Sequence, residues 1–225
     1  MAINKPYAGP SELAPILPLF PLEGALLLPR CQLPLNVFEP RYVAMIDAAL
    51  ASHRLIGIIQ TAPQQPALAV PGAPDIVGVG CAGRITEIAE SGDGRYLLNL
   101  SGIARFRVVA EVDSGTPFRQ AKVDYTPFSD DFTPNAGADA VDRALLLRTL
   151  ADYLDANQLE ADWKSIKDAP NEALVNALAM MAPFGPREKQ ALLEAPNLAA
   201  RAEMLIAVTE MSMARTGGEG DGTLQ

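Results

Sequence analysis

Few side chains of this 225-residue chain have the types and spacing that catalysis needs. His53 is the only histidine, which excludes an HExxH zinc motif and leaves a serine–histidine pair with a single candidate base. No lysine follows a glycine, so the chain has no GxxxxGKS/T phosphate loop, and it has no GxSxG nucleophile elbow. We therefore predict that the chain is not an enzyme. We assign His53 to the end of a helix predicted at 40–51, where a cation stabilises the last carbonyls.

A glycine pattern raises the possibility of nucleotide binding. Gly78, Gly80 and Gly83 spell GxGxxG. In a dinucleotide site a helix opens at the third glycine, so that its N-terminus meets the pyrophosphate. Here Arg84, Ile85 and Thr86 continue a strand-like pattern. The spacing therefore predicts bends in a sheet, and no cofactor.

Metal binding is not favoured by the available ligands. Cys31 and Cys81 are the only cysteines, and with His53 they would have to converge from three separate elements. Structural zinc is usually held by four such ligands in paired spacing. We predict no metal and two reduced, partly buried thiols, which is typical of a cytoplasmic protein.

Arginines gather in the middle of the chain. Arg105 and Arg107 lie on one face of a predicted strand, with Arg84 and Arg95 on elements expected nearby. This face could be solvated, could form salt bridges to the domain's own carboxylates, or could contact an anion or RNA. The net charge of −9 makes nucleic acid an unfavoured partner, because such binding depends on release of counterions by Lys and Arg.

The apolar run at 16–28 does not indicate export or membrane insertion. Pro18, Pro21 and Glu23 interrupt it, and no basic segment precedes it. No run approaches the roughly 18 apolar residues of a membrane span. We expect a protein without a membrane partner.

Residues 16–50 contain the clearest local signals. The prolines divide the apolar run into short edge-type strands, because each removes a backbone donor. In the segment LPLNVF the side chains alternate between two faces: Leu33, Leu35 and Val37 on one, and Pro34, Asn36 and Phe38 on the other. A helix then begins at Pro40, with Glu39 as its N-cap.

The next part of the chain is predicted to be mostly β. The strand at 55–60 is followed by a Pro-rich loop at 61–75. Residues 76–101 are predicted to form a hairpin with its turn at 91–94. A bulge near Thr86, or a bend at the glycines, would reconcile the phase of its first strand. Further strands follow at 105–112 and 121–125.

Beyond residue 125 the pattern changes. Residues 126–139 have turn formers at most positions and are predicted to be a linker. The later periodic segments are helical: 141–158, 173–181, a short helix beginning at Pro186, and a last one from the N-cap Asn197 to about Ala214. We predict an α+β chain with a β domain at 14–125, a helical bundle at 139–214, and flexible termini at 1–13 and 215–225.

The order LPLFPLEGALLLP, LPLNVFEPRY, a helix and the strand LIGIIQ resembles the N-terminal substrate-recognition domain of the ATP-dependent protease Lon, in its stand-alone bacterial form. GRYLLNLSGIARFRV and REKQALLE are also similar to segments of that family, so the resemblance covers about residues 14–212. It implies a PUA-like, mostly antiparallel β pseudobarrel with one helix, followed by a C-terminal helical bundle. It also implies a non-catalytic polypeptide-binding module that lacks the ATPase and protease domains. An RNA-binding PUA-like protein is the alternative.

The expected partners are unfolded or exposed polypeptide segments, or a folded protein, and the oligomeric state is left open. Leu35, Val37 and Phe38 are the candidate peptide-binding residues, because they cannot all point inward from a two-sided strand. The strand edge around them would offer backbone groups to an extended peptide.

Overall fold

The computed structural model describes residues 4–62 and 75–219, so most of the predicted Pro-rich loop lies outside the described residues. The strands are β1 (Ile16–Pro21), β2 (Gln32–Val37), β3 (Leu55–Ile59), β4 (Val79–Ser91), β5 (Arg95–Val112) and β6 (Gln120–Asp124). The α-helices are α1 (Pro40–Leu50), α2 (Arg143–Ala156), α3 (Trp163–Asp168), α4 (Asn171–Met181), α5 (Pro186–Glu194) and α6 (Leu198–Glu219). Short 3-10 helices are η1 (Pro10–Glu12), η2 (Thr126–Phe132) and η3 (Ala138–Ala140).

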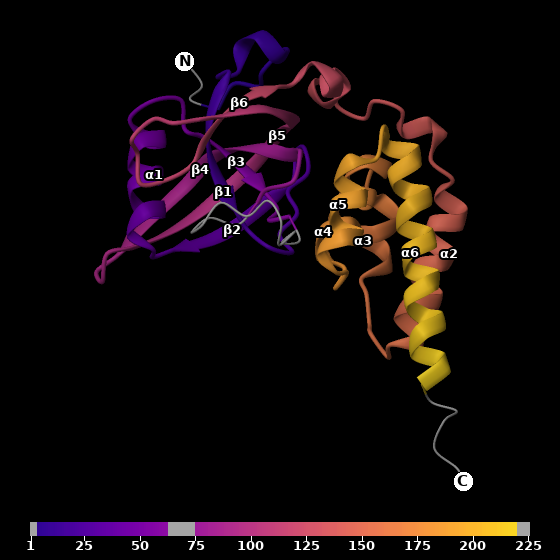
Figure 1. The fold of residues 1–225 in the computed structure, drawn as a ribbon. Coiled ribbons are helices and arrows are strands. Elements are labelled where there is room, and N and C mark those ends of the chain that lie inside the picture. Colours follow the sequence, from indigo (N-terminus) through magenta and orange to yellow (C-terminus); the bar gives the residue numbers. More distant parts are fainter. Residues whose placement is uncertain (1–3, 63–74, 220–225) are drawn as a thin grey trace. The chain divides into compact units, whose positions relative to one another are not determined.

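The strands form a 6-stranded sheet in the order β2-β5-β4-β3-β1-β6. An additional pairing of β6 with β5 closes β5, β4, β3, β1 and β6 into a ring (Figure 1). Only β1 and β3 are parallel among the pairs within the described strands. The first half of β5 also pairs with β2, and its turn with β4 projects beyond the ring (Figure 1). We call β2, residues 87–91 of β4 and residues 95–101 of β5 the extension.

Two irregularities shape the long β4–β5 hairpin. The predicted bulge near Thr86 is confirmed, because Ile85 pairs with Leu100 and Glu87 with Asn99. The prediction of two strands within 95–112 is wrong, because β5 continues past a second irregularity beside Gly102. A Cβ atom at Gly102 would lie 2.1 Å from the Leu28 carbonyl oxygen, so a glycine is needed there.

The interior of the ring is apolar. Its cluster of buried residues comprises Leu13, Leu17, Leu19, Leu55, Ile59, Ala82, Ala104, Phe106, Ala121, Val123 and Tyr125. Residues 4–13, expected to form a flexible terminus, are in fact attached to this unit. Arg84 Nη1 donates to the Lys5 carbonyl at 2.9 Å, and Leu13 is buried in the cluster. At the other end, α6 extends to Glu219 and so takes up part of the predicted C-terminal tail.

The chain divides into two compact units. Unit 1 comprises 1–134 and 184–193, and unit 2 comprises 135–183 and 194–225. In unit 2, Asn197 Oδ1 accepts a hydrogen bond from the Ala200 amide at 2.9 Å, which confirms its predicted capping role. Asn176, the one polar residue between Ala173 and Met181 of α4, accepts a hydrogen bond from Arg201 Nη1 of α6 at 2.9 Å. This hydrogen bond satisfies the buried Asn176 carbonyl oxygen, as is usual for buried polar groups.

Helix α5 belongs to unit 1, although the sequence placed it within the bundle at 139–214. Lys189 Nζ donates to the Gly24 carbonyl at 3.0 Å, and Gln190 Nε2 donates to the Val79 carbonyl at 3.1 Å. Leu192 and Leu193 are buried with 0% and 3% of their surface exposed. The strands therefore depend on a helix that follows them by more than fifty positions. The boundaries 14–125 and 139–214 stay a prediction about independent folding.

Replacing Leu192 with alanine is expected to destabilise unit 1 by about 2–5 kcal/mol, because it leaves a cavity under α5. Hydrogen exchange of the β1 to β6 amides should become faster. Trp163 is the only tryptophan and lies in unit 2, so its fluorescence transition should keep its midpoint if the units unfold separately. Met181→Ala is the control, because Met181 is 80% exposed. Unchanged β-strand protection in the Leu192 variant would contradict the assignment of α5.

Candidate functional site

One face of the extension forms a shallow groove of about 520 Å³. Its lining comprises Pro34, Leu35, Asn36, Glu87, Ile88, Ala89, Leu97, Leu98 and Asn99. Leu97 of β5 is directly opposite Asn36 on one side and Ala89 on the other. Directly opposite residues in antiparallel strands direct their side chains to the same face. Asn36, Leu97 and Ala89 therefore share one face, and Leu97 is the central residue of the three. We call it the groove face.

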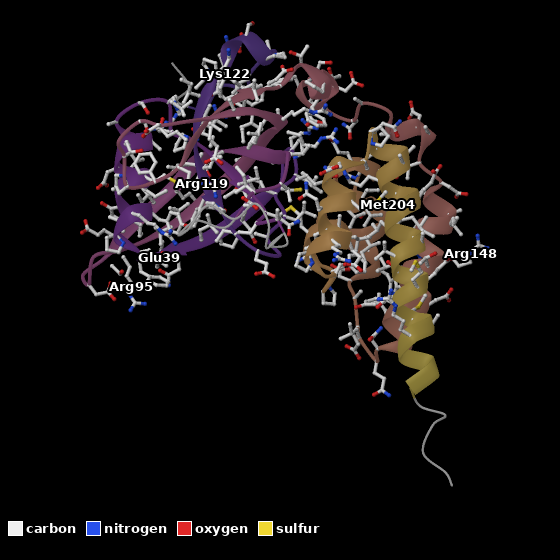
Figure 2. All side chains as sticks on the ribbon, viewed as in Figure 1. Glu39, Arg95, Arg119, Lys122, Arg148 and Met204 are labelled. Atoms are coloured by element: carbon white, nitrogen blue, oxygen red, sulfur yellow. The ribbon has the colours of Figure 1, made fainter. Side chains whose placement is uncertain are left out.

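The groove face is apolar at its centre and charged at its rim. Leu97 is 50% exposed, and Phe38, just after β2, is 60% exposed. The Arg95 guanidinium carbon lies 5.6 Å from the Phe38 ring centroid, and Arg95 Nε is 2.9 Å from Asp93 Oδ2. Figure 2 labels Arg95 at this end of the strands. Two large apolar side chains on one face provide a surface that a partner can cover.

The three residues predicted as a peptide site occupy different environments. Phe38 is exposed beside the groove face, as described above. Leu35 also borders the groove, but it is opposite Leu98, so its side chain lies on the face away from Leu97. Val37 is 1% exposed and closed to solvent. Their role in binding stays a prediction, which now rests on Phe38 and on the groove's other residues.

Leu97 was missed from the sequence, although a signal was present. Tyr96, Leu98 and Leu100 alternate along this strand in the sequence, and Leu98 and Leu100 are buried. Leu97 is therefore an apolar residue on the outward face, which is unusual in a strand with one solvated side.

The outer edge of β2 is less suited to backbone pairing than expected. β2 is terminal in the sheet order. Pro34 lies in its middle and has no N–H to donate, as is common in edge strands. An added strand would pair with an interrupted row of donors. Side-chain contacts on the groove face are therefore the stronger basis for recognition.

The four arginines do not form one solvated face, so that interpretation is wrong. Arg105 is 3% exposed, and Arg84 is 8% exposed and bound to backbone carbonyls of 4–5, while Arg95 and Arg107 are exposed. Arg105 forms a salt bridge within the domain, which was one of the open alternatives. A continuous basic surface for RNA is absent from these four positions.

Arg105 forms a buried ion pair with Asp131 of η2. Arg105 Nη2 is 2.8 Å from Asp131 Oδ1, and Nε is 2.9 Å from Oδ2. The Arg105 amide also donates to Oδ2 at 2.9 Å, and Nη1 donates to the Leu193 carbonyl of α5 at 3.1 Å. The segment 126–139, predicted to be a linker, is thus anchored in unit 1 by Asp131 and by buried Phe128. This site is structural, because both charges are closed to solvent.

His53 does not cap α1 as a cation, so that prediction is wrong. Its Nδ1 accepts a hydrogen bond from the Leu55 amide at 3.1 Å, which requires that nitrogen to be unprotonated. Ser52 Oγ donates to the Ala48 carbonyl at 2.8 Å and closes the end of the helix. Burial lowers the pKa of His53 below its usual value of about 6.5.

The lowered pKa predicts a loss of stability in acid. The folded state favours neutral His53, so its contribution is fully present above the unfolded pKa of about 6.5 and is lost as pH falls through the folded pKa. His53→Asn keeps an acceptor for the Leu55 amide and does not titrate. We expect the free energy of unfolding to fall less between about pH 7.5 and about pH 5 in this variant than in the parent chain. Parallel pH profiles would exclude the assigned role.

The remaining candidate sites have structural roles. Gly80 and Gly83 lie inside β4, and no helix opens there; a Cβ at Gly80 would lie 2.6 Å from the Ile58 carbonyl oxygen. Cys31 and Cys81 are both thiols. Within residues 4–62 and 75–219, no group of three or more metal-ligating side chains is found, and no helix is long and apolar enough to cross a membrane.

Comparison with known proteins identifies the family of this chain. Residues 16–209 match the family model of the ATP-dependent protease La (LON) substrate-binding domain. Lon protease 2 of Myxococcus xanthus is 27% identical over 201 residues, which cover 87% of this chain and 23% of that protein. Lon protease of Escherichia coli (strain K12) is 25% identical over 206 residues, covering 86% of this chain and 24% of that protein. The chain thus spans about a quarter of the length of these curated relatives.

Two solved structures show the same fold. The Lon N-terminal domain protein from Xanthomonas campestris has a TM-score of 0.59 at 23% identity, covering 85% of this chain and 97% of that one. The N-terminal domain of Mycobacterium avium complex Lon protease has a TM-score of 0.63 at 18% identity, covering 87% and 98%. The predicted α+β fold and the resemblance are confirmed.

Proposed function

Because the chain belongs to the family of the ATP-dependent protease La (LON) substrate-binding domain, we propose that it is a non-catalytic module that binds exposed segments of other polypeptides. The observation that carries the proposal is the groove face, with Leu97 of β5 and the neighbouring Phe38, just after β2, half or more exposed. A cytoplasmic location is part of the proposal, because Cys31 and Cys81 remain thiols.

The groove face suits an extended, apolar segment. Its volume of about 520 Å³ accommodates a few side chains, and its rim carries both a carboxylate, Glu87, and a guanidinium, Arg95. Such a surface selects for apolar content and is tolerant of sequence. Ordering a flexible ligand costs several kcal/mol, so the affinity should be of order micromolar or weaker.

Binding to a fluorescently labelled unfolded polypeptide, compared with structured RNA at two salt concentrations, tests the proposal. We expect binding of the polypeptide that changes little with salt, and no RNA binding at either concentration. RNA binding that weakens steeply with salt would favour the alternative PUA-like function. The comparisons give no support for that alternative. The buried Arg105 and Arg84 also leave it without a basic surface at these positions.

A further inference from the structure

A second pocket of unit 1, about 440 Å³ in volume, has a composition unlike that of the groove. It lies between the end of β1, the start of α1 and the segment that precedes β6. Leu19 and Phe118 form an apolar floor and are both buried. Arg41, Tyr42 and Arg119 supply polar walls. Figure 2 labels Arg119 and Glu39, two of the charged residues that line it.

Tyr42 lines this pocket and carries an unused donor. The residue is 9% exposed, and its ring packs on Phe20 with centroids 4.3 Å apart. Within the described residues its hydroxyl makes no hydrogen bond. The hydroxyl can therefore donate to a ligand, and a ligand that accepts from it gains a hydrogen bond.

Two guanidiniums lie near the hydroxyl, and each is paired with a carboxylate: Arg41 with Glu39, and Arg119 with Glu111. Burial raises the pKa of Tyr42, while Arg41 and Arg119 lower it and Glu39 raises it. Both guanidiniums are therefore within electrostatic reach of the hydroxyl. Arg41 donates to Glu39 through Nε at 3.0 Å and Nη2 at 2.8 Å, and its Nη1 makes no hydrogen bond within the described residues. The first turn of α1 adds the positive end of a helix dipole.

We propose that this pocket holds the C-terminal residue of a bound polypeptide, with the α-carboxylate against Tyr42 and Arg41 and an apolar side chain on Leu19 and Phe118. The inference rests on the proposed polypeptide binding and adds a chain terminus as a recognised feature. The volume is enough for one large residue, which fits a terminal position better than a continuing chain. An inorganic anion would leave the apolar floor without a contact.

The test compares peptides that are identical except for a free or an amidated C-terminus, each ending in phenylalanine. We expect the peptide with the free C-terminus to bind this chain at least tenfold more tightly than the amidated peptide, because amidation removes the charge-assisted hydrogen bonds of the carboxylate. In Tyr42→Phe and in Arg41→Gln the ratio should fall toward one. Arg107→Gln is the matched control, because Arg107 is an exposed arginine outside the pocket and should leave the ratio unchanged.

A second measurement separates this inference from the proposed function. N-acetyl-phenylalanine and its amide are added at millimolar concentration while the amide signals of Tyr42 and Phe118 are followed by NMR. If only the acid shifts these signals and no long peptide binds, carboxylate binding in the pocket is supported and the proposed polypeptide-binding function is rejected. Equal binding of free and amidated peptides, with no shifts at these residues, would overturn the pocket and leave the groove face standing.

Discussion

Asp131→Ala is expected to lower the free energy of unfolding of unit 1 by about 3–5 kcal/mol, because it leaves Arg105 as an uncompensated buried charge. The side chains of Arg105 and Asp131 are 4% and 7% exposed. The pair also connects β5 and η2 with the C-terminal end of α5 through the Leu193 carbonyl. A loss of this size is a large fraction of the roughly 5–15 kcal/mol that stabilises a typical domain. Chemical denaturation followed by hydrogen exchange of the β5 amides measures it.

Asp130→Ala is the matched control, because Asp130 is the exposed neighbour of Asp131 and should change stability by no more than about 0.5 kcal/mol. The double variant Arg105→Met with Asp131→Leu should be more stable than Asp131→Ala alone, since it removes both charges and fills the space. If the Asp131 variant were as stable as the Asp130 variant, the ion pair would not anchor η2.

Leu97→Asp is expected to weaken polypeptide binding by roughly 10- to 150-fold. The change removes an apolar side chain worth about 1.5–3 kcal/mol when it is covered, and each 1.4 kcal/mol is a factor of about ten. It also places a carboxylate at the centre of the groove face. Leu97 is 50% exposed, so the fold should tolerate the change. Titration of a labelled unfolded polypeptide by fluorescence anisotropy gives the affinity.

Val109→Asp provides the control on the same strand. Val109 is 57% exposed in the second half of β5 and does not line the groove. The affinity of the Val109→Asp variant for the polypeptide should match that of the parent chain. Equal losses in the two variants would indicate a non-specific effect of charge, and no loss in Leu97→Asp would remove the groove face from the account.

The local pattern was enough to predict most strands and one irregularity. Alternation located β2 and the hairpin, and the phase change between Ile85 and Ile88 predicted the bulge at Thr86. These features are local, because the period of two and the glycine positions are visible in a short window. The continuity of β5 past Gly102 could not be predicted from a short window, because it depends on the approach of residue 28 from a distant segment.

Long-range pairs account for the larger errors. Arg105 and Asp131 are 26 positions apart, and the turn-forming composition of 126–139 concealed a buried carboxylate. The assignment of α5 to unit 1 depends on contacts such as Lys189 with Gly24, 165 positions apart. A helical pattern shows that a segment is a helix, but not which core it covers. Leu97 was missed although it had a local signal, namely an apolar side chain on the outward face.

Chemical-shift mapping with an unfolded, apolar peptide tests the central claim most directly, because it identifies the bound surface without any substitution. The account predicts shifts of the amides at 34–38 and 87–99, which surround the groove face, at micromolar to millimolar peptide. Shifts confined to 140–183 and 194–214, or no shifts at millimolar peptide, would contradict it.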